Sequence, residues 1–123
     1  MLNEHLSAEE ILSDLIGFNT VSAHSNLALI KYIEDYLSNF GLNPVRISNV
    51  DGTKANLYAT IGPSDKPGII LSGHTDVVPV ANQPWKTNPF ELIRKPVNDK
   101  IRLYGRGTCL LYTSDAADEG LGV

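Results

Sequence analysis

The chain has 123 residues, of which 42% are hydrophobic and 20% charged, and its formal net charge is -4 with an isoelectric point near 5.2. These values are typical of a globular protein, and they argue against a disordered chain and against a surface for nucleic acid or anionic membranes. The single cysteine excludes an internal disulfide, and no apolar run approaches the roughly 20 residues of a membrane span. The first residues lack the basic segment and apolar core of a secretory leader, so we expect a cytoplasmic protein.

Two helices are predicted at the start of the chain. Ser7 and Glu10 have the spacing of a capping box, and the apolar residues after them recur at helical intervals until Gly17, which predicts the end of the helix. A second amphipathic helix is predicted from near Asn26 to Gly41. Between the two, we expect residues 18–22 to be only a connection.

The hydrophobic period changes from helical to alternating after the second helix. Residues 43–48 predict a half-buried strand, residues 56–61 predict the next strand, and residues 50–53 predict the turn between them. Residues 62–68 have the composition of a loop. The unbroken apolarity of residues 69–72 predicts a central strand covered on both faces. Helices followed by such strands indicate an α/β or α+β layer structure.

The next segment is rich in proline. Three prolines between residues 79 and 89 exclude regular secondary structure there, because proline fixes φ and removes a donor. Trp85 in this segment is either an aromatic plug beneath a site or a wall of a substrate pocket, and the plug is favoured because buried aromatic side chains mostly pack. Residues 90–94 and 101–104 predict a hairpin that would bring the segment Gly105-Arg106-Gly107 to the site. These glycines lack the spacing of a phosphate-binding loop.

The candidate chemical groups follow the predicted central strand. His74 and Asp76 stand in the run Ser-Gly-His-Thr-Asp-Val-Val-Pro. A neutral imidazole binds zinc through one ring nitrogen while a carboxylate holds the other N–H and fixes the tautomer. This division favours His74 as a metal ligand and Asp76 as the carboxylate behind it. The pattern by itself leaves open a surface histidine beside a solvated aspartate, because His-x-Asp is a frequent combination.

Three blocks in register resemble the family of zinc-dependent acetylornithine deacetylases, succinyl-diaminopimelate desuccinylases and carboxypeptidases. They are residues 72–79, 83–92 and 103–108. The resemblance covers nearly all of the chain up to Thr108 and implies the truncated N-terminal part of a zinc-exopeptidase-like catalytic domain, an α/β fold with a mixed sheet flanked by helices. By resemblance, His74 is a metal ligand and Asp76 the catalytic carboxylate behind it.

The family resemblance also implies an activity and its requirements. We expect hydrolysis of the amide bond of an N-acyl amino acid by Zn²⁺ or Co²⁺, with two ions in the complete enzyme, which is expected to be a homodimer. The segment Gly-Arg-Gly-Thr-Cys at residues 105–109 most resembles the acetylornithine deacetylases, which convert N-acetylornithine to ornithine and acetate in arginine biosynthesis. A succinyl-diaminopimelate desuccinylase or another aminoacylase or peptidase of the family is the alternative.

The sequence departs from the family motif after Cys109. The motif continues Cys-Asp-Met-Lys-Gly, in which the aspartate bridges two metals, but Leu110 stands at that position. Residues 109–123 instead resemble the translation of a transposase sequencing adapter, and Cys109 fits both the family motif and the adapter. We therefore predict a deacylase segment at residues 1–108 and a non-native tail at 109–123, with a genuinely divergent C-terminus as the alternative.

A second hypothesis follows from the missing ligands. A zinc site needs three or four protein ligands, and His74 is one. Residues 1–123 alone are therefore predicted to be a non-catalytic fragment with an incomplete metal site, while the parent protein is an enzyme.

Overall fold

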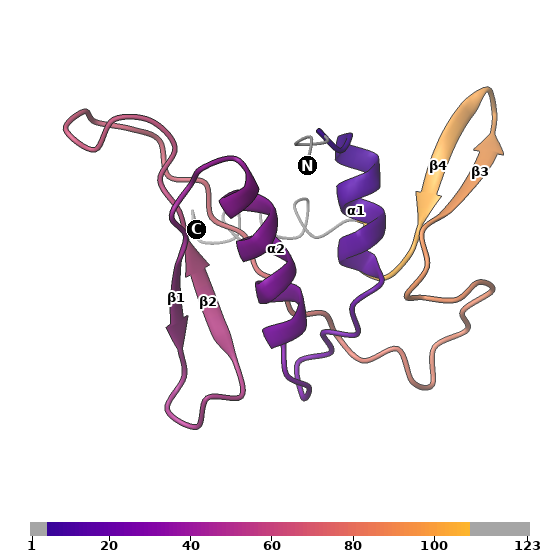
Figure 1. Ribbon diagram of the computed structural model, residues 1–123. Coiled ribbons are helices and arrows are strands. Elements are labelled where there is room, and N and C mark those ends of the chain that lie inside the picture. The colour runs from indigo at the N-terminus through magenta and orange to yellow at the C-terminus, as the bar shows by residue number, and fades with distance from the viewer. Residues whose placement is uncertain (1–4, 109–123) are drawn as a thin grey trace, which may run out of the picture.

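The structure is a computed structural model that describes residues 5–108. In chain order it contains helices α1 (Ala8–Ile16) and α2 (Leu27–Asn39) and strands β1 (Val45–Ser48), β2 (Ala55–Tyr58), β3 (Ile93–Val97) and β4 (Lys100–Tyr104) (Figure 1). The strands form two separate antiparallel pairs, β1–β2 and β3–β4. The α/β class is confirmed for this part of the chain, but its strands do not form the expected mixed sheet. The predicted non-native tail, residues 109–123, lies outside the described residues.

Helix α1 begins and ends where its sequence signals predict. The Ser7 hydroxyl accepts a hydrogen bond from the Glu10 N–H at 3.2 Å, and the Ser7 N–H donates to the Glu10 carboxylate at 2.7 Å, which completes the capping box. These Ser7 donors hold the pKa of Glu10 below its ordinary value. At the other end, the Gly17 N–H donates to carbonyls of the last turn.

The core lies where α2 packs against β2. Leu29, Ile30 and Ala55 are 3%, 2% and 5% exposed, and apolar side chains from both helices and β2 surround them. A second contact joins the helices, because the Tyr32 hydroxyl of α2 donates to the Asp14 carboxylate of α1 at 2.7 Å. Partial burial and this carboxylate raise the pKa of Tyr32 to about 12. As predicted, α2 begins directly after Asn26.

The β1–β2 hairpin is confirmed, but one prediction about it is wrong. Its register pairs Val45 with Tyr58 and Ser48 with Ala55. All of β1 is exposed rather than half-buried, and Val45 and Ile47 keep 55% and 58% of their surface. The reason is that β2 supplies the residues of this hairpin that pack on α2, so β1 lacks a covering layer in the described part of the chain.

The predicted central strand at residues 69–72 is the main correction. These residues are not in a strand, and Ile69, Ile70 and Leu71 are 90%, 84% and 93% exposed. A strand exists only where a neighbour completes its hydrogen bonds, and no described segment lies beside this one. An open groove of about 850 Å³ separates residues 72–76 from β2, with the apolar side of α2 among its walls. The apolar side chains of residues 69–71, whose pattern predicted burial, therefore face solvent.

The second hairpin is confirmed with shifted boundaries. Its first strand runs over Ile93–Val97 instead of residues 90–94, and Pro96 pairs with Ile101 within it. Pro96 is tolerated because β3 has a partner on one side only, so no donor is needed on the other. Asn98 and Asp99 form the turn with φ of +48° and +60°, the left-handed conformation that two-residue hairpin loops require.

No helix among the described residues is long and apolar enough to cross a membrane.

Candidate functional site

The segment that carries His74 and Asp76 is held by the connection between α1 and α2. Val21 forms an isolated parallel bridge with Val77, in which the Val77 N–H donates to the Thr20 carbonyl and the Ser22 N–H to the Val77 carbonyl, both at 3.0 Å. Val21 and Val77 are 8% and 7% exposed. What the sequence predicted as a simple connection therefore acts as a short backbone support for the site.

Thr75, between the two candidate residues, is anchored on both its backbone and its side chain. The buried Thr20 hydroxyl donates to the Thr75 carbonyl at 2.6 Å, and the Asn26 amide donates to the Thr75 hydroxyl at 3.3 Å. The same Asn26 side chain exchanges two hydrogen bonds with the backbone of Ala55, at 2.8 and 3.0 Å. Asn26 thus ties the site segment to the start of β2 and to the core.

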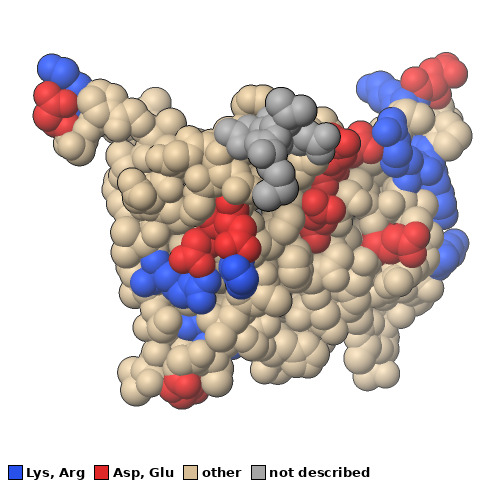
Figure 2. Space-filling model, viewed as in Figure 1, with Lys and Arg blue, Asp and Glu red and all other residues tan. Residues whose placement is uncertain are grey.

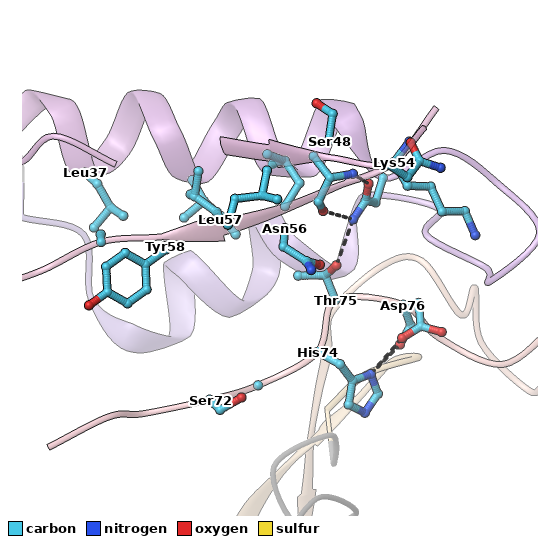
Figure 3. Close-up of a pocket in the computed structure, with 18 residues that line it drawn as sticks. Leu37, Ser48, Lys54, Asn56, Leu57, Tyr58, Ser72, His74, Thr75 and Asp76 are labelled. Atoms are coloured by element: carbon cyan, nitrogen blue, oxygen red, sulfur yellow. Dashed lines mark hydrogen bonds and ion pairs between the residues drawn. The ribbon is translucent and has the colours of Figure 1, made fainter. Parts of the chain in front are cut away.

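His74 and Asp76 are brought together, as the sequence predicts. His74 Nδ1 lies 3.0 Å from Asp76 Oδ1 and 3.0 Å from the Asp76 carbonyl oxygen. Figure 3 shows the ring of His74 turned toward Asp76, while Thr75 points the other way, toward β2. Both partners of Nδ1 are acceptors, so Nδ1 carries the hydrogen and the neutral ring keeps its free lone pair on Nε2.

Asp76 is oriented by a second donor. The Ser22 hydroxyl donates to Asp76 Oδ2 at 2.7 Å, so each carboxylate oxygen has its own partner. This hydrogen bond is the largest cause that lowers the pKa of Asp76 from its ordinary value, and the hydrogen bond from His74 acts in the same direction against partial burial. Asp76 is therefore an ionised carboxylate that fixes the imidazole.

The arrangement can offer one nitrogen to a metal. Nε2 of His74 is directed away from Asp76, and 47% of the His74 side chain is exposed. Within residues 5–108 there is no cluster of three or more His, Cys, Asp or Glu side chains able to hold a metal ion. The described residues therefore supply one possible metal-binding nitrogen, Nε2 of His74, and the hydrogen bonds through Asp76 and Ser22 that orient it.

The sequence interpretation missed three residues of this site, namely Thr20, Ser22 and Asn26. Each contacts residues 75–76 from a position 49 to 55 residues earlier in the chain. Small polar residues in a connection are common, so spacing gave no signal for them. Tertiary contacts place them beside the site, namely the parallel bridge between Val21 and Val77 and the bonds of Asn26 to Ala55.

The proline segment and the hairpin end meet each other. The indole N–H of Trp85 donates to Gln83 Oε1 at 3.0 Å, and the Arg106 guanidinium donates to the same oxygen. The guanidinium carbon of Arg106 lies 4.8 Å from the centroid of the Trp85 indole. The Arg106 N–H donates to the Pro89 carbonyl at 2.6 Å. Trp85 is half-buried and lines a second cavity that shares no residue with the groove containing His74, so both roles expected for it at the site remain predictions.

Gly105 explains why the chain approaches α1 so closely. It is buried, and a Cβ at this position would lie 3.1 Å from the Ile16 side chain. Gly105 and Arg106 thus contact α1 and the proline segment. The expected approach of residues 105–107 to His74 remains a prediction.

The chain is similar in sequence to curated proteins named as desuccinylases or deacetylases. A succinyl-diaminopimelate desuccinylase of Rickettsia bellii is 41% identical over 100 residues, which is 79% of this chain and 24% of that protein. A protein of the same name from Legionella pneumophila is 36% identical over 99 residues, or 80% of this chain and 24% of the relative. An acetylornithine deacetylase of Proteus mirabilis is 37% identical over 107 residues, or 80% of this chain and 26% of the relative.

The chain thus spans about a quarter of the length of these relatives. No family model matches it, and no solved structure does.

Proposed function

We propose that the chain is the N-terminal part of a metal-dependent amidohydrolase that cleaves the amide bond of an N-acyl amino acid. The observation that carries this proposal is the hydrogen-bonded series Ser22–Asp76–His74, which leaves Nε2 of the imidazole free. Metal-binding histidines are commonly held this way, with the second ring N–H on a carboxylate. The similarity of four-fifths of the chain to desuccinylases and deacetylases supports the same assignment.

In this proposal His74 binds Zn²⁺ or Co²⁺ through Nε2, and Asp76 fixes the tautomer and raises the basicity of the ring. A metal held there would supply Lewis-acid chemistry, lowering the pKa of a water molecule and polarising the amide carbonyl. The donor set fits one ligand of such a site, whereas zinc needs three or four. Further ligands and the general base would come from other parts of a complete enzyme with two ions. We propose a cytoplasmic homodimer for that enzyme.

The acyl group is the finer part of the proposal. The segment Gly-Arg-Gly-Thr-Cys favours N-acetylornithine, as in arginine biosynthesis, whereas desuccinylase is the more frequent name among the relatives. We therefore propose N-acetylornithine and N-succinyl-diaminopimelate as the two substrates to compare. The relative rates of the complete enzyme on these two compounds decide between them.

Two steps test the proposal. Long-read sequencing of the source DNA across the codon of Thr108 is expected to reveal Cys-Asp-Met-Lys-Gly, and an encoded Leu-Leu-Tyr tail that terminates would contradict the assignment. In the complete enzyme, His74→Gln is expected to lower bound metal and hydrolysis by about 100-fold or more, because even changes behind a ligand cost 10–100-fold.

The exposed His24 provides the matched control, and His24→Gln is expected to leave both quantities unchanged. Residues 1–123 alone are expected to show no hydrolysis. Metal-dependent hydrolysis by this fragment would refute the role given to the absent ligands.

A further inference from the structure

A second cavity lies between the proline segment and the β3–β4 hairpin. Its volume is about 480 Å³, and its walls include Trp85, Lys86, Thr87, Lys95 and Tyr104. It shares no lining residue with the groove that contains His74. Ligand pockets commonly measure about 300 to 1,000 Å³ and combine apolar walls with a few polar groups. The cavity has this size and composition.

The aromatic wall is fixed before any ligand arrives. Trp85 is held on its edge by the Gln83 side chain and on its face by the guanidinium of Arg106, which donates to the same Gln83 oxygen. Gln83 is itself tied back, because its amide donates to the Pro79 carbonyl at 3.0 Å. A wall that does not need ordering on binding costs less conformational entropy.

The cavity is positively charged in a chain whose net charge is negative. Lys86 and Lys95 line it, no carboxylate does, and neither lysine forms an ion pair within the described residues. Lys95 lies 5.5 Å from the centroid of the Tyr104 ring and directly opposite Arg102 in the hairpin register. Like charges at directly opposed positions are unfavourable. Figure 2 shows Lys and Arg gathered along the edge where Figure 1 places this hairpin.

We propose that this cavity binds a small organic acid, with its carboxylate at Lys86 and Lys95 and a short apolar chain against Trp85 and Tyr104. An anion there would offset the repulsion within the hairpin. The aromatic walls favour an acid with an apolar body over inorganic phosphate. Arg106, whose guanidinium is the group best suited to hold phosphate with two parallel bonds, does not line the cavity and instead packs on Trp85 and bonds to Gln83. The proposal does not depend on the metal site.

Trp85 is the single tryptophan of the protein, so its fluorescence reports on this cavity alone. We would titrate the full 123-residue chain with valerate, which has one carboxylate on an apolar chain, and with valeramide, which has the same carbon chain and no charge. Valerate is expected to change the emission saturably, and valeramide is not. Lys86→Gln and Lys95→Gln are each expected to raise the half-saturating concentration about two- to five-fold, the range that exposed ion pairs provide.

Two variants separate binding from general effects. Lys66→Gln removes an exposed lysine that does not line the cavity and is expected to leave the titration unchanged. Lys95→Arg keeps the charge and is expected to retain binding, while unchanged emission of each free variant shows that the wall around Trp85 is intact. An equal response to valeramide, an equal response to sodium sulfate at matched ionic strength, or full binding by the variant with both Lys86→Gln and Lys95→Gln would each overturn the proposal.

Discussion

Asn26 is the residue whose replacement tests most directly how the site is attached to the core. Its side-chain oxygen accepts from the Ala55 N–H at 3.0 Å, and its amide donates to the Ala55 carbonyl at 2.8 Å. Ala55 is 5% exposed, so Asn26→Ala leaves two buried backbone groups without a partner. Each such group costs about 1–3 kcal/mol. Asn26 makes no side-chain cap bond to α2, so loss of a cap does not add to this sum.

We therefore expect Asn26→Ala to lower the free energy of unfolding by about 2–6 kcal/mol, a large part of the roughly 5–15 kcal/mol of a typical domain. Urea unfolding followed by circular dichroism at 222 nm measures this, and the midpoint is expected to fall by about 1 M or more. Asn26→Asp keeps the size and the acceptor but places a carboxylate against the Ala55 carbonyl, so it is also expected to destabilise.

The control for this prediction is Asn39→Ala, at an exposed asparagine near the end of α2. Surface replacements of this kind change stability by about 0.5 kcal/mol or less. If Asn26→Ala were no more destabilising than Asn39→Ala, the Ala55 groups would be satisfied without Asn26, and the reasoning would be refuted.

Two further predictions concern the site and the exposed apolar segment. Ser22→Ala removes the main donor to Asp76, so the pKa of Asp76 is expected to rise toward its ordinary value in an NMR titration of the carboxyl carbon. Because the pKa of Asp76 is lower in the folded than in the unfolded protein, ionised Asp76 stabilises the fold above the unfolded pKa, and this stabilisation is lost as the pH falls through the folded pKa. An unchanged pKa of Asp76 in Ser22→Ala would contradict the role of Ser22. Ile70→Lys places a charge in the exposed run at residues 69–71 and is expected to reduce self-association in light scattering, whereas Lys66→Gln in the neighbouring loop is not.

Predictions that depended on neighbours in sequence were accurate. The capping box of Ser7, the end of α1 at Gly17 and the start of α2 after Asn26 all follow from groups within one helical turn. The pairing of His74 with Asp76 is equally local, since the imidazole and the carboxylate that holds it are only two positions apart in the chain. Both hairpins were also predicted, although the boundaries of β2, predicted at residues 56–61, and of β3 were not.

Predictions that depended on a distant partner failed or were not made. Residues 69–72 have the composition of a buried strand, yet no described segment pairs with them, so they are exposed. The supports of the site, Thr20, Ser22 and Asn26, and the contact between Trp85 and Arg106 join positions 21 to 55 residues apart.

The sequence by itself thus determined the helices, the turns and the pairing of His74 with Asp76, because their hydrogen bonds close between residues a few positions apart. Only the tertiary structure decided which side chains hold that pair in place, which apolar segments are covered and where the second cavity forms. The physical reason is that burial and long-range hydrogen bonds belong to two segments at once. Neither segment carries the identity of its partner in its own pattern.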